Sequence, residues 1–356
     1  LLVCRSDRPL AQGLKEKIAL FSNVPVERVI SAVNAACIYE LPLMLHAEGI
    51  DVQIAERLNI WSRQPVLSSW KQTVERFKRP SHGSVRIGVV GKYVHLQDSY
   101  KSLHEALVHG GLASGVSVEL DYIDSEDIER SSPAERLAGL DGILVPGGFG
   151  DRGVEGKIAA IRHVRENRIP YFGICLGMQL AVVEFARHVC GLNGANSTEV
   201  EKSPPHPVID LMPGQSTRRE TGESMRLGAW TCVLQRGSRA QAIYGTDEIS
   251  ERHRHRWEVN NAYRDALHRY GLVLSGTSPD DSLVEMIELD HHPHFIGCQF
   301  HPEFKSRPLA AHPLFAAFVA AARQRRDEPT SDRVQAATLA PEGAIACTTG
   351  AACAAK

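Results

Sequence analysis

The sequence lacks the patterns typical of structural zinc proteins, membrane proteins and nucleic-acid-binding proteins. Its eight cysteines are scattered, with no C-x-x-C pair and no histidine partner at zinc spacing. No apolar run is long enough to cross a membrane, and the N-terminus carries no secretory signal. The net charge is −2 and no basic stripe is present, which argues against a nucleic-acid partner. We therefore expect no metal site, no membrane contact, and reduced thiols in a cytoplasmic protein.

A phosphate-binding loop is also missing. The pattern G-x-x-x-x-G-K-[ST] occurs nowhere in the 356 residues, and Gly88 to Lys92 is too short for one. The stretch from Gly148 to Gly153 does match the dinucleotide pattern G-x-G-x-x-G. However, Pro146 stands between it and the preceding apolar run, and no acidic residue ends a strand about twenty positions later. We expect no cofactor bound by this chain alone.

Composition divides the chain into four predicted parts. Residues 1–60 have too little apolar material for their own core, so we expect the remnant of a larger α/β domain that packs against a missing partner. The chain begins with Leu, which suggests a fragment or a processed chain. Residues 61–84 are polar and rich in breaks, as in an interdomain linker. Residues 85–326 predict the main domain, and residues 327–356 predict a disordered tail.

The main domain alternates short apolar runs with amphipathic segments. Strands are predicted at residues 85–90, 116–123, 142–145 and 171–174, with helices at 100–112 and 155–165 between them. This alternation favours a doubly wound, mostly parallel α/β sheet of the flavodoxin-like kind. Further strands after residue 200 predict a mixed extension of that sheet, and residues 312–325 predict a closing helix.

One cysteine lies where a predicted strand turns directly into a helix. Cys175 follows the apolar run Tyr171 to Ile174, and Gly173 and Gly177 flank it two residues away on each side. This is the nucleophile-elbow pattern with Cys in place of Ser. The N-terminus of the following helix would stabilise a thiolate. A buried structural cysteine is the alternative interpretation.

Two later features favour the catalytic interpretation. The glycine-rich loop around Gly148 favours a backbone that approaches a ligand closely, with Gly148 and Leu176 as the natural pair of oxyanion donors. A loop with only a folding role is the alternative. His301, after an apolar strand, is a candidate general base, and Glu303 two residues on can orient it across an extended segment fixed by Pro302. Sixteen histidines occur in the chain, so a lone His-x-Glu would be weak support. Together the features favour a Cys–His–Glu triad.

Three motifs resemble the signatures of class I glutamine amidotransferases. They read P-G-G-F-G from Pro146, G-I-C-L-G-M-Q from Gly173 and C-Q-F-H-P-E-F from Cys298. Other segments resemble CTP synthases in particular, including the run R-H-R-H-R-W-E-V-N from Arg252 and the segment from Cys4 to Phe21, which is similar to the end of their synthetase domain. The resemblance covers nearly everything before the tail.

The resemblance implies roles for individual residues. Cys175, His301 and Glu303 match the triad of that family. Gly148 and Leu176 match its oxyanion donors. The residues that match groups holding glutamine are Gly147, Gln179, Glu199 and Arg256. Phe149 and Arg152 match the region where GTP, the activator, acts, and Lys17 resembles a residue near the nucleotide site for UTP.

The family makes CTP from UTP, ATP and glutamine, so the resemblance implies these partners. ATP, Mg²⁺ and most of the UTP site would belong to a synthetase domain that this sequence mostly lacks, and the full-length protein would be a homo-tetramer. Three alternatives stay open: an amidotransferase serving a purine or carbamoyl phosphate, a non-catalytic module, and a Cys–His hydrolase of γ-glutamyl compounds. The basic run at Arg252 argues against the first, and the complete triad against the second.

Overall fold

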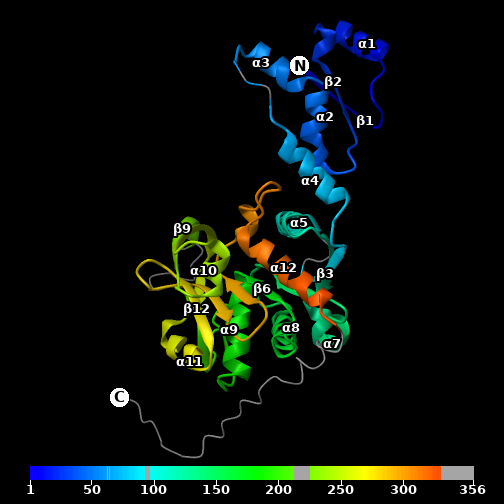
Figure 1. Ribbon diagram of the computed structural model, residues 1–356. Helices are drawn as coiled ribbons and strands as arrows, with labels where there is room; N and C mark the ends of the chain where they lie inside the picture. The colour runs from blue at the N-terminus through cyan, green and yellow to red at the C-terminus, as the bar shows by residue number, and fades with distance from the viewer. Residues whose placement is uncertain (62, 64, 93–96, 212–224, 330–356) are drawn as a thin grey trace, which may run out of the picture.

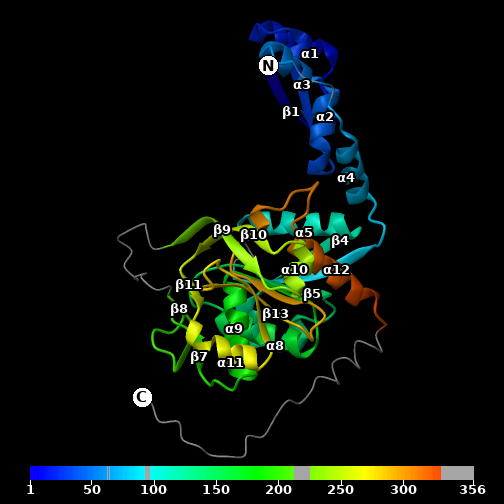
Figure 2. The same ribbon diagram turned by 60° about the vertical axis from the view of Figure 1, so that its left-hand side comes forward.

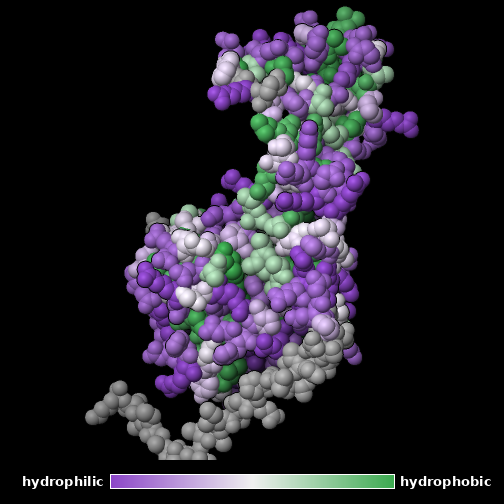
Figure 3. Space-filling view, in the orientation of Figure 1, coloured by the Kyte–Doolittle hydropathy of each residue, from purple (hydrophilic) through white to green (hydrophobic). Residues whose placement is uncertain are grey.

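The computed structural model describes residues 1–61, 63, 65–92, 97–211 and 225–329. In its N-terminal part, a two-stranded parallel sheet joins β1 (Leu2–Ser6) to β2 (Val29–Val33). Short helices surround this sheet: α1 (Gln12–Ser22), η1 (Val26–Arg28), η2 (Ile38–Glu40), α2 (Leu41–Ala47) and α3 (Ile50–Arg57). Large apolar side chains in this part stay exposed, among them Leu20, Phe21 and Leu58, and Figure 3 shows green apolar areas over it.

Helix α4 (Ser68–Lys78) connects this part to the main domain (Figures 1 and 2). It lies within the segment expected to be a linker. A small apolar cluster joins Cys37 and Tyr39 to Val74 of α4 and to Leu112 of the main domain. The Tyr39 hydroxyl also donates to the Glu105 carboxylate at 2.7 Å. These contacts tie the N-terminal part to the main domain.

The main domain is built on a nine-stranded sheet in the part of the chain that the structure describes, with the order β10-β9-β12-β13-β14-β6-β5-β3-β4. Strands β3, β4, β5, β6 and β14 run parallel, and the remaining strands extend the sheet in antiparallel fashion. The bounds are β3 (Ser84–Gly91), β4 (Ser117–Asp124), β5 (Gly142–Val145), β6 (Tyr171–Ile174), β9 (Arg226–Leu234), β10 (Glu248–His255), β12 (Leu272–Thr277), β13 (Val284–Leu289) and β14 (Phe295–Cys298). The predicted doubly wound α/β fold with a mixed extension is confirmed.

Helices cover both faces of this sheet. One core joins the strands to α8 (Val154–Glu166) and α9 (Leu176–His188), and a second joins them to α5 (Lys101–Ser114) and α12 (Pro313–Asp327). Figure 2 shows these helices on opposite sides of the sheet. The central strands β5, β6 and β14 are therefore buried on both faces, which explains their continuous apolar runs. The shorter elements are η3 (Gln97–Tyr100), α6 (Ser125–Arg130), α7 (Pro133–Arg136), α10 (Arg239–Tyr244), η4 (Asn261–Tyr263) and α11 (Arg264–Arg269).

A separate three-stranded sheet lies beside α9. It has the order β11-β8-β7, from β11 (Trp257–Val259), β8 (His206–Leu211) and β7 (Ala195–Ser197). The sequence did not predict it, because two of its strands, β7 and β11, have only three residues and leave almost no periodic pattern. At the other end of the chain, α12 ends at Asp327, so most of the predicted disordered tail lies outside the described residues.

Candidate active site

Cys175 occupies the turn between β6 and α9. Its backbone has φ 51° and ψ −103°, a conformation that L-residues rarely adopt. Both flanking glycines are required by close packing. A Cβ on Gly177 would lie 2.1 Å from the Val145 carbonyl oxygen, and one on Gly173 would lie 2.6 Å from the Tyr171 hydroxyl. Helix α9 therefore begins immediately after the thiol, as the elbow pattern predicted.

His301 and Glu303 lie against this thiol, after β14. The His301 Nδ1 and the Glu303 Oε1 are 2.8 Å apart, and His301 hydrogen bonds to the Cys175 side chain. Burial opposes a charge on the imidazole, but the hydrogen bonds to Cys175 and Glu303 outweigh it and raise the pKa of His301 to about 10. At neutral pH this favours an imidazolium beside the Cys175 side chain.

The backbone between the two residues is not the extended segment that the sequence analysis expected. Pro302, Glu303 and Phe304 form a single 3-10 turn, η5 (Pro302–Phe304). Proline is compatible with the first position of such a turn and also with an extended segment, because both conformations have φ near −65°. The turn brings Glu303 back under the imidazole, and the backbone N–H of His301 donates to the Arg252 carbonyl at 2.7 Å, which anchors the turn to β10.

The glycine loop lies across the thiol from the helix. A Cβ on Gly147 would come within 2.8 Å of the His301 ring and 3.5 Å of the Cys175 Cβ, so this position leaves room for the imidazole. Gly148 lies next to the Leu176 side chain. A cavity of about 220 Å³ opens here, and Gly147, Gly148, Cys175 and His301 all line it. The expected oxyanion donors thus lie beside the nucleophile.

The residues expected to hold glutamine come from different parts of the main domain: Gly147 from the loop after β5, Gln179 from α9, Glu199 from the turn after β7, and Arg256 from the junction of β10 and β11. The Glu199 carboxylate accepts from the Gly150 N–H at 3.0 Å and faces Arg256. Burial raises the pKa of Glu199, while the Gly150 N–H and the charges of Lys92 and Arg256 oppose that rise. The Arg256 Nε is buried without a hydrogen-bond partner among the described residues. Neither Glu199 nor Arg256 lines the 220 Å³ cavity.

Three further predicted residues lie on the surface. Phe149 is largely exposed at the mouth of the cavity. Arg152 is exposed and pairs with Glu126, with its Nε 3.2 Å from the carboxylate. Lys17 lies exposed on α1 in the N-terminal part, which Figure 1 shows well apart from the triad elements β6, α9 and β14.

Comparison with known proteins decides the family. The model described as glutamine amidotransferase class-I matches residues 95–321, which is more than half of the chain. The chain belongs to the class I glutamine amidotransferases. The model described as CTP synthase N-terminus matches residues 1–60.

The curated relatives of this amidotransferase include CTP synthases, in agreement with the expected resemblance. The chain is 54% identical over 333 residues to a CTP synthase of Syntrophus aciditrophicus, and the match covers 94% of this chain and 62% of the relative. It is 55% identical over 322 residues to that of Geotalea uraniireducens, covering 90% and 60%. The chain thus spans about 60% of the length of the curated relatives it matches.

A solved structure gives the same result for the fold. The glutaminase domain of a Trypanosoma brucei CTPS with bound acivicin superposes with a TM-score of 0.63 at 42% identity. The match covers 67% of this chain and 94% of that domain. In this amidotransferase, the described residues contain no group of side chains arranged to hold a metal ion. None of its described helices is long and apolar enough to cross a membrane.

The sequence analysis missed Gln299, which contacts the nucleophile. Its side-chain nitrogen lies 3.6 Å from the Cys175 sulfur, and its side-chain oxygen accepts from Gln179 at 3.2 Å. A signal was available, because Gln299 precedes His301 by two residues and alternation places both on one side of an extended strand. Cys298, the last residue of β14, is fully buried in the same core cluster as Cys175, and burial raises its pKa.

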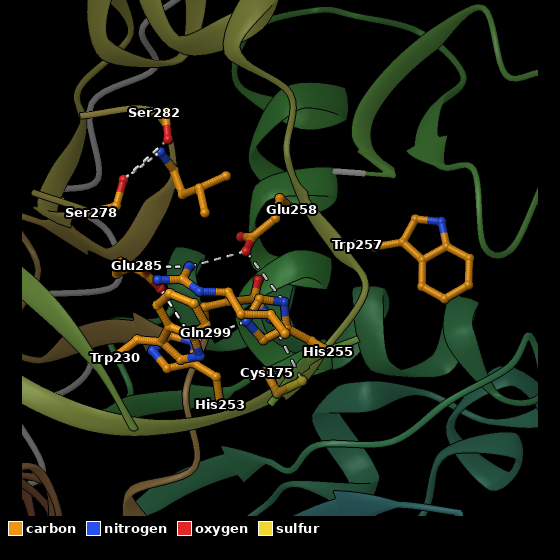
Figure 4. Close-up of polar contacts among 12 residues, drawn as sticks. Cys175, Trp230, His253, His255, Trp257, Glu258, Ser278, Ser282, Glu285 and Gln299 are labelled. Carbon is orange, nitrogen blue, oxygen red and sulfur yellow. Dashed lines mark hydrogen bonds and ion pairs between the residues drawn. The ribbon is translucent and has the colours of Figure 1, made fainter. Parts of the chain in front are cut away.

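A second unpredicted feature lies behind the site. Five buried polar side chains, here called the buried polar cluster, contact one another: Arg226, His253, His255, Glu258 and Glu285. Figure 4 shows its two histidines and two glutamates near Gln299 and Cys175. The charge of Arg226 is shared by two carboxylates, since it pairs with Glu285 and lies 3.5 Å from Glu258. One guanidinium between two carboxyls favours keeping one carboxyl protonated.

Burial dominates the titration of these groups. It lowers the pKa of His253 to about 2 and of His255 to about 3, and it raises the pKa of Glu285 to about 7 and that of Glu258 well above its ordinary value. Burial likewise lowers the pKa of His292 to about 4 and of His294 to about 3, in the turn between β13 and β14. All four histidines are therefore neutral at pH 7.

Proposed function

We propose that this chain is the glutamine-hydrolysing part of a CTP synthase, and that the ammonia it releases serves the ATP-dependent amination of UTP to CTP. The observation that carries the proposal is the placement of Cys175 on a strained elbow with His301 and Glu303 against it. The length of the match to CTP synthases, including residues 1–60, supports the choice of acceptor.

In the proposed mechanism, the Cys175 thiolate attacks the amide carbon of glutamine. Backbone N–H groups of Gly148 and Leu176 stabilise the oxyanion of the tetrahedral intermediate. His301, held as an imidazolium by Glu303, gives its proton to the departing ammonia and leaves a glutamyl thioester. His301 then takes a proton from the water that hydrolyses the thioester, and glutamate leaves.

The same arrangement supports a glutamine-binding role for the neighbouring residues. A carboxylate at Glu199 suits the α-ammonium group of the substrate, and a guanidinium at Arg256 suits its α-carboxylate. The buried Arg256 Nε without a described partner is consistent with a ligand that completes its hydrogen bonding. Gly147 takes part by leaving space for His301 and the substrate.

Amination would need residues outside this chain. The sequence contains no phosphate-binding loop, so ATP, its Mg²⁺ and most of UTP would be bound by the further length that the relatives have. The exposed apolar residues of the N-terminal part fit packing against such a domain. We propose that Lys17 borders the UTP site, that Phe149 and Arg152 contact the activator GTP, and that the complete protein is a cytoplasmic homo-tetramer.

The test measures glutamate and CTP separately. The 356-residue chain should hydrolyse glutamine slowly, and it should form no CTP with ATP and UTP present, whether glutamine or ammonia is the donor. Joining it to the upstream domain of a close relative should restore both CTP-forming reactions. Hydrolysis of γ-glutamyl peptides in preference to glutamine would contradict the proposal, and so would CTP formed by the chain alone.

A further inference from the structure

We propose that Gln299 is a further catalytic residue, which donates a hydrogen bond to the Cys175 thiolate and is held in that orientation by Gln179 and the backbone of Trp257. The inference deepens the proposed glutamine hydrolysis and rests on it for its catalytic meaning. Three contacts carry it, and they form one continuous chain from strand β11 to the Cys175 sulfur. Figure 4 shows Gln299 beside Cys175 at the end of this chain.

The first contact determines the orientation of Gln179. Its side-chain Nε2 lies 2.9 Å from the backbone carbonyl oxygen of Trp257. A backbone carbonyl can only accept, so the amide nitrogen of Gln179 must be the atom that faces it. The same nitrogen also donates to Gln299. Both of its hydrogens are therefore used within the protein, and only the carbonyl oxygen of Gln179 remains to face a substrate.

The second contact carries this orientation to Gln299. The Gln179 Nε2 donates at 3.2 Å, so the group of Gln299 that faces it must be the acceptor Oε1. The Gln299 Nε2 then points the opposite way, where it lies 3.6 Å from the Cys175 sulfur. Gln179 can donate to both the Trp257 carbonyl and Gln299 only if Gln299 turns its amide oxygen toward Gln179. The amide N–H of Gln299 then faces the Cys175 sulfur.

Burial makes this donor effective. Gln299 is 0% exposed, and Gln179 and Cys175 are each 3% exposed. Water has almost no access to these groups, so the amide takes over part of the solvation that a thiolate loses on burial. A hydrogen bond to a charged acceptor is stronger than one between neutral groups. The thiolate thus has His301 and Gln299 as side-chain donors.

The relay is anchored at both ends beside the buried polar cluster. The backbone N–H of Gln299 donates to the Glu285 carbonyl at 2.8 Å, and the residue after Trp257 is Glu258. The side chains of these two glutamates share Arg226. One anchor, Glu285, belongs to this cluster, and the other, Trp257, directly precedes its member Glu258. The cluster therefore gives the two Gln side chains a rigid frame, which keeps the direction of their amide groups fixed.

The test is the pH dependence of Cys175 alkylation by iodoacetamide, followed on the Cys175 peptide by mass spectrometry. Only the thiolate reacts, so the rate rises with pH to a plateau. Gln299→Met keeps the length but removes the donor, and Gln299→Glu keeps the shape but places a carboxylate at the sulfur. Gln235→Met, an exposed glutamine in the loop after β9, is the matched control.

We expect the midpoint of the alkylation profile to move up by about one pH unit in Gln299→Met, which is about a tenfold loss of reactivity at neutral pH. The shift should be larger in Gln299→Glu, with the high-pH plateau unchanged in both. A role in packing alone would change the plateau rate and leave the midpoint in place, and that result would overturn the proposal. The control should match the unmodified chain.

Two further readouts keep the outcomes distinct. Should Gln299→Met fail to fold by circular dichroism, the isosteric Gln299→Glu decides, and an unmoved midpoint there refutes the inference. Alkylation needs no glutamine, so a shifted midpoint in a chain without glutaminase activity would refute the proposed function and leave the thiolate donor standing. With activity present, kcat should fall about tenfold in Gln299→Met while KM changes less than threefold.

Discussion

Replacing Glu303 by glutamine should show how the triad divides its work. The His301 Nδ1 is 2.8 Å from the Glu303 carboxylate, and both side chains are mostly buried. The pKa of His301 is raised from its ordinary 6.5 to about 10 against the effect of burial, by contacts with Cys175 and Glu303. The difference of about 3.5 pH units corresponds to about 5 kcal/mol in favour of the imidazolium.

If Glu303 supplies about half of this energy, its negative charge raises the pKa of His301 by roughly 1 to 2 pH units. This corresponds to a factor of about 10 to 100 in the proton affinity of the imidazole. An amide also can donate to Nδ1, which would leave the wrong tautomer facing the thiol. We therefore expect kcat for glutamine hydrolysis to fall by about 100- to 1,000-fold in Glu303→Gln. KM should change less than threefold, because Glu303 does not contact the α-amino or α-carboxylate groups in the proposed mechanism.

The assay is glutamate formation between pH 6 and 10. In the unmodified chain the alkaline limb of kcat/KM should lie near pH 10, where His301 loses its proton, and in Glu303→Gln it should move down to about pH 8 to 9. In Glu303→Asp the alkaline limb of kcat/KM should stay near pH 10, and kcat should fall less than in Glu303→Gln. Glu119 is exposed on β4, so Glu119→Gln should leave both the pH profile and kcat unchanged. An alkaline limb that stays near pH 10 in Glu303→Gln would refute the reasoning.

Three other predictions test the nucleophile, the substrate clamp and the buried histidines. Cys175→Ala should lower glutaminase turnover by several orders of magnitude, whereas Cys298→Ala should keep it; comparable losses would contradict the assignment. Arg256→Ala should raise KM for glutamine by about 10- to 100-fold with a smaller change in kcat, seen in initial rates. The free energy of unfolding in urea should fall as the pH is lowered from 6.5 to 5. Burial lowers the pKa of four histidines to between about 2 and about 4 in the folded state. Below pH 6.5 these histidines therefore take up protons in the unfolded state but not in the folded state. Each costs up to about 1.4 kcal/mol per pH unit. The raised pKa values of Glu199, Glu258 and Glu285 act in the opposite direction, but three groups do not outweigh four. An unchanged urea midpoint between these pH values would count against this account.

Local features of the sequence were enough to predict the catalytic turn and the parallel half of the sheet. Strands buried on both faces leave continuous apolar runs, and the flanking glycines of Cys175 mark a turn too crowded for any side chain. The same local chemistry led to one wrong expectation, the extended segment at Pro302, because proline is compatible with an extended chain and with the first turn of a helix.

Tertiary structure alone decided which distant polar groups meet. The three-residue strand β11 has no periodic signal, yet its Trp257 carbonyl orients Gln179, which is 78 positions away in the chain. Arg226, Glu258 and Glu285 come from three different strands, and each would be read from sequence as an exposed charge. Their burial depends on how strands far apart in sequence are ordered in space. A sequence pattern therefore located the strand-to-helix turn at Cys175, and only the assembled sheets determined which groups surround it.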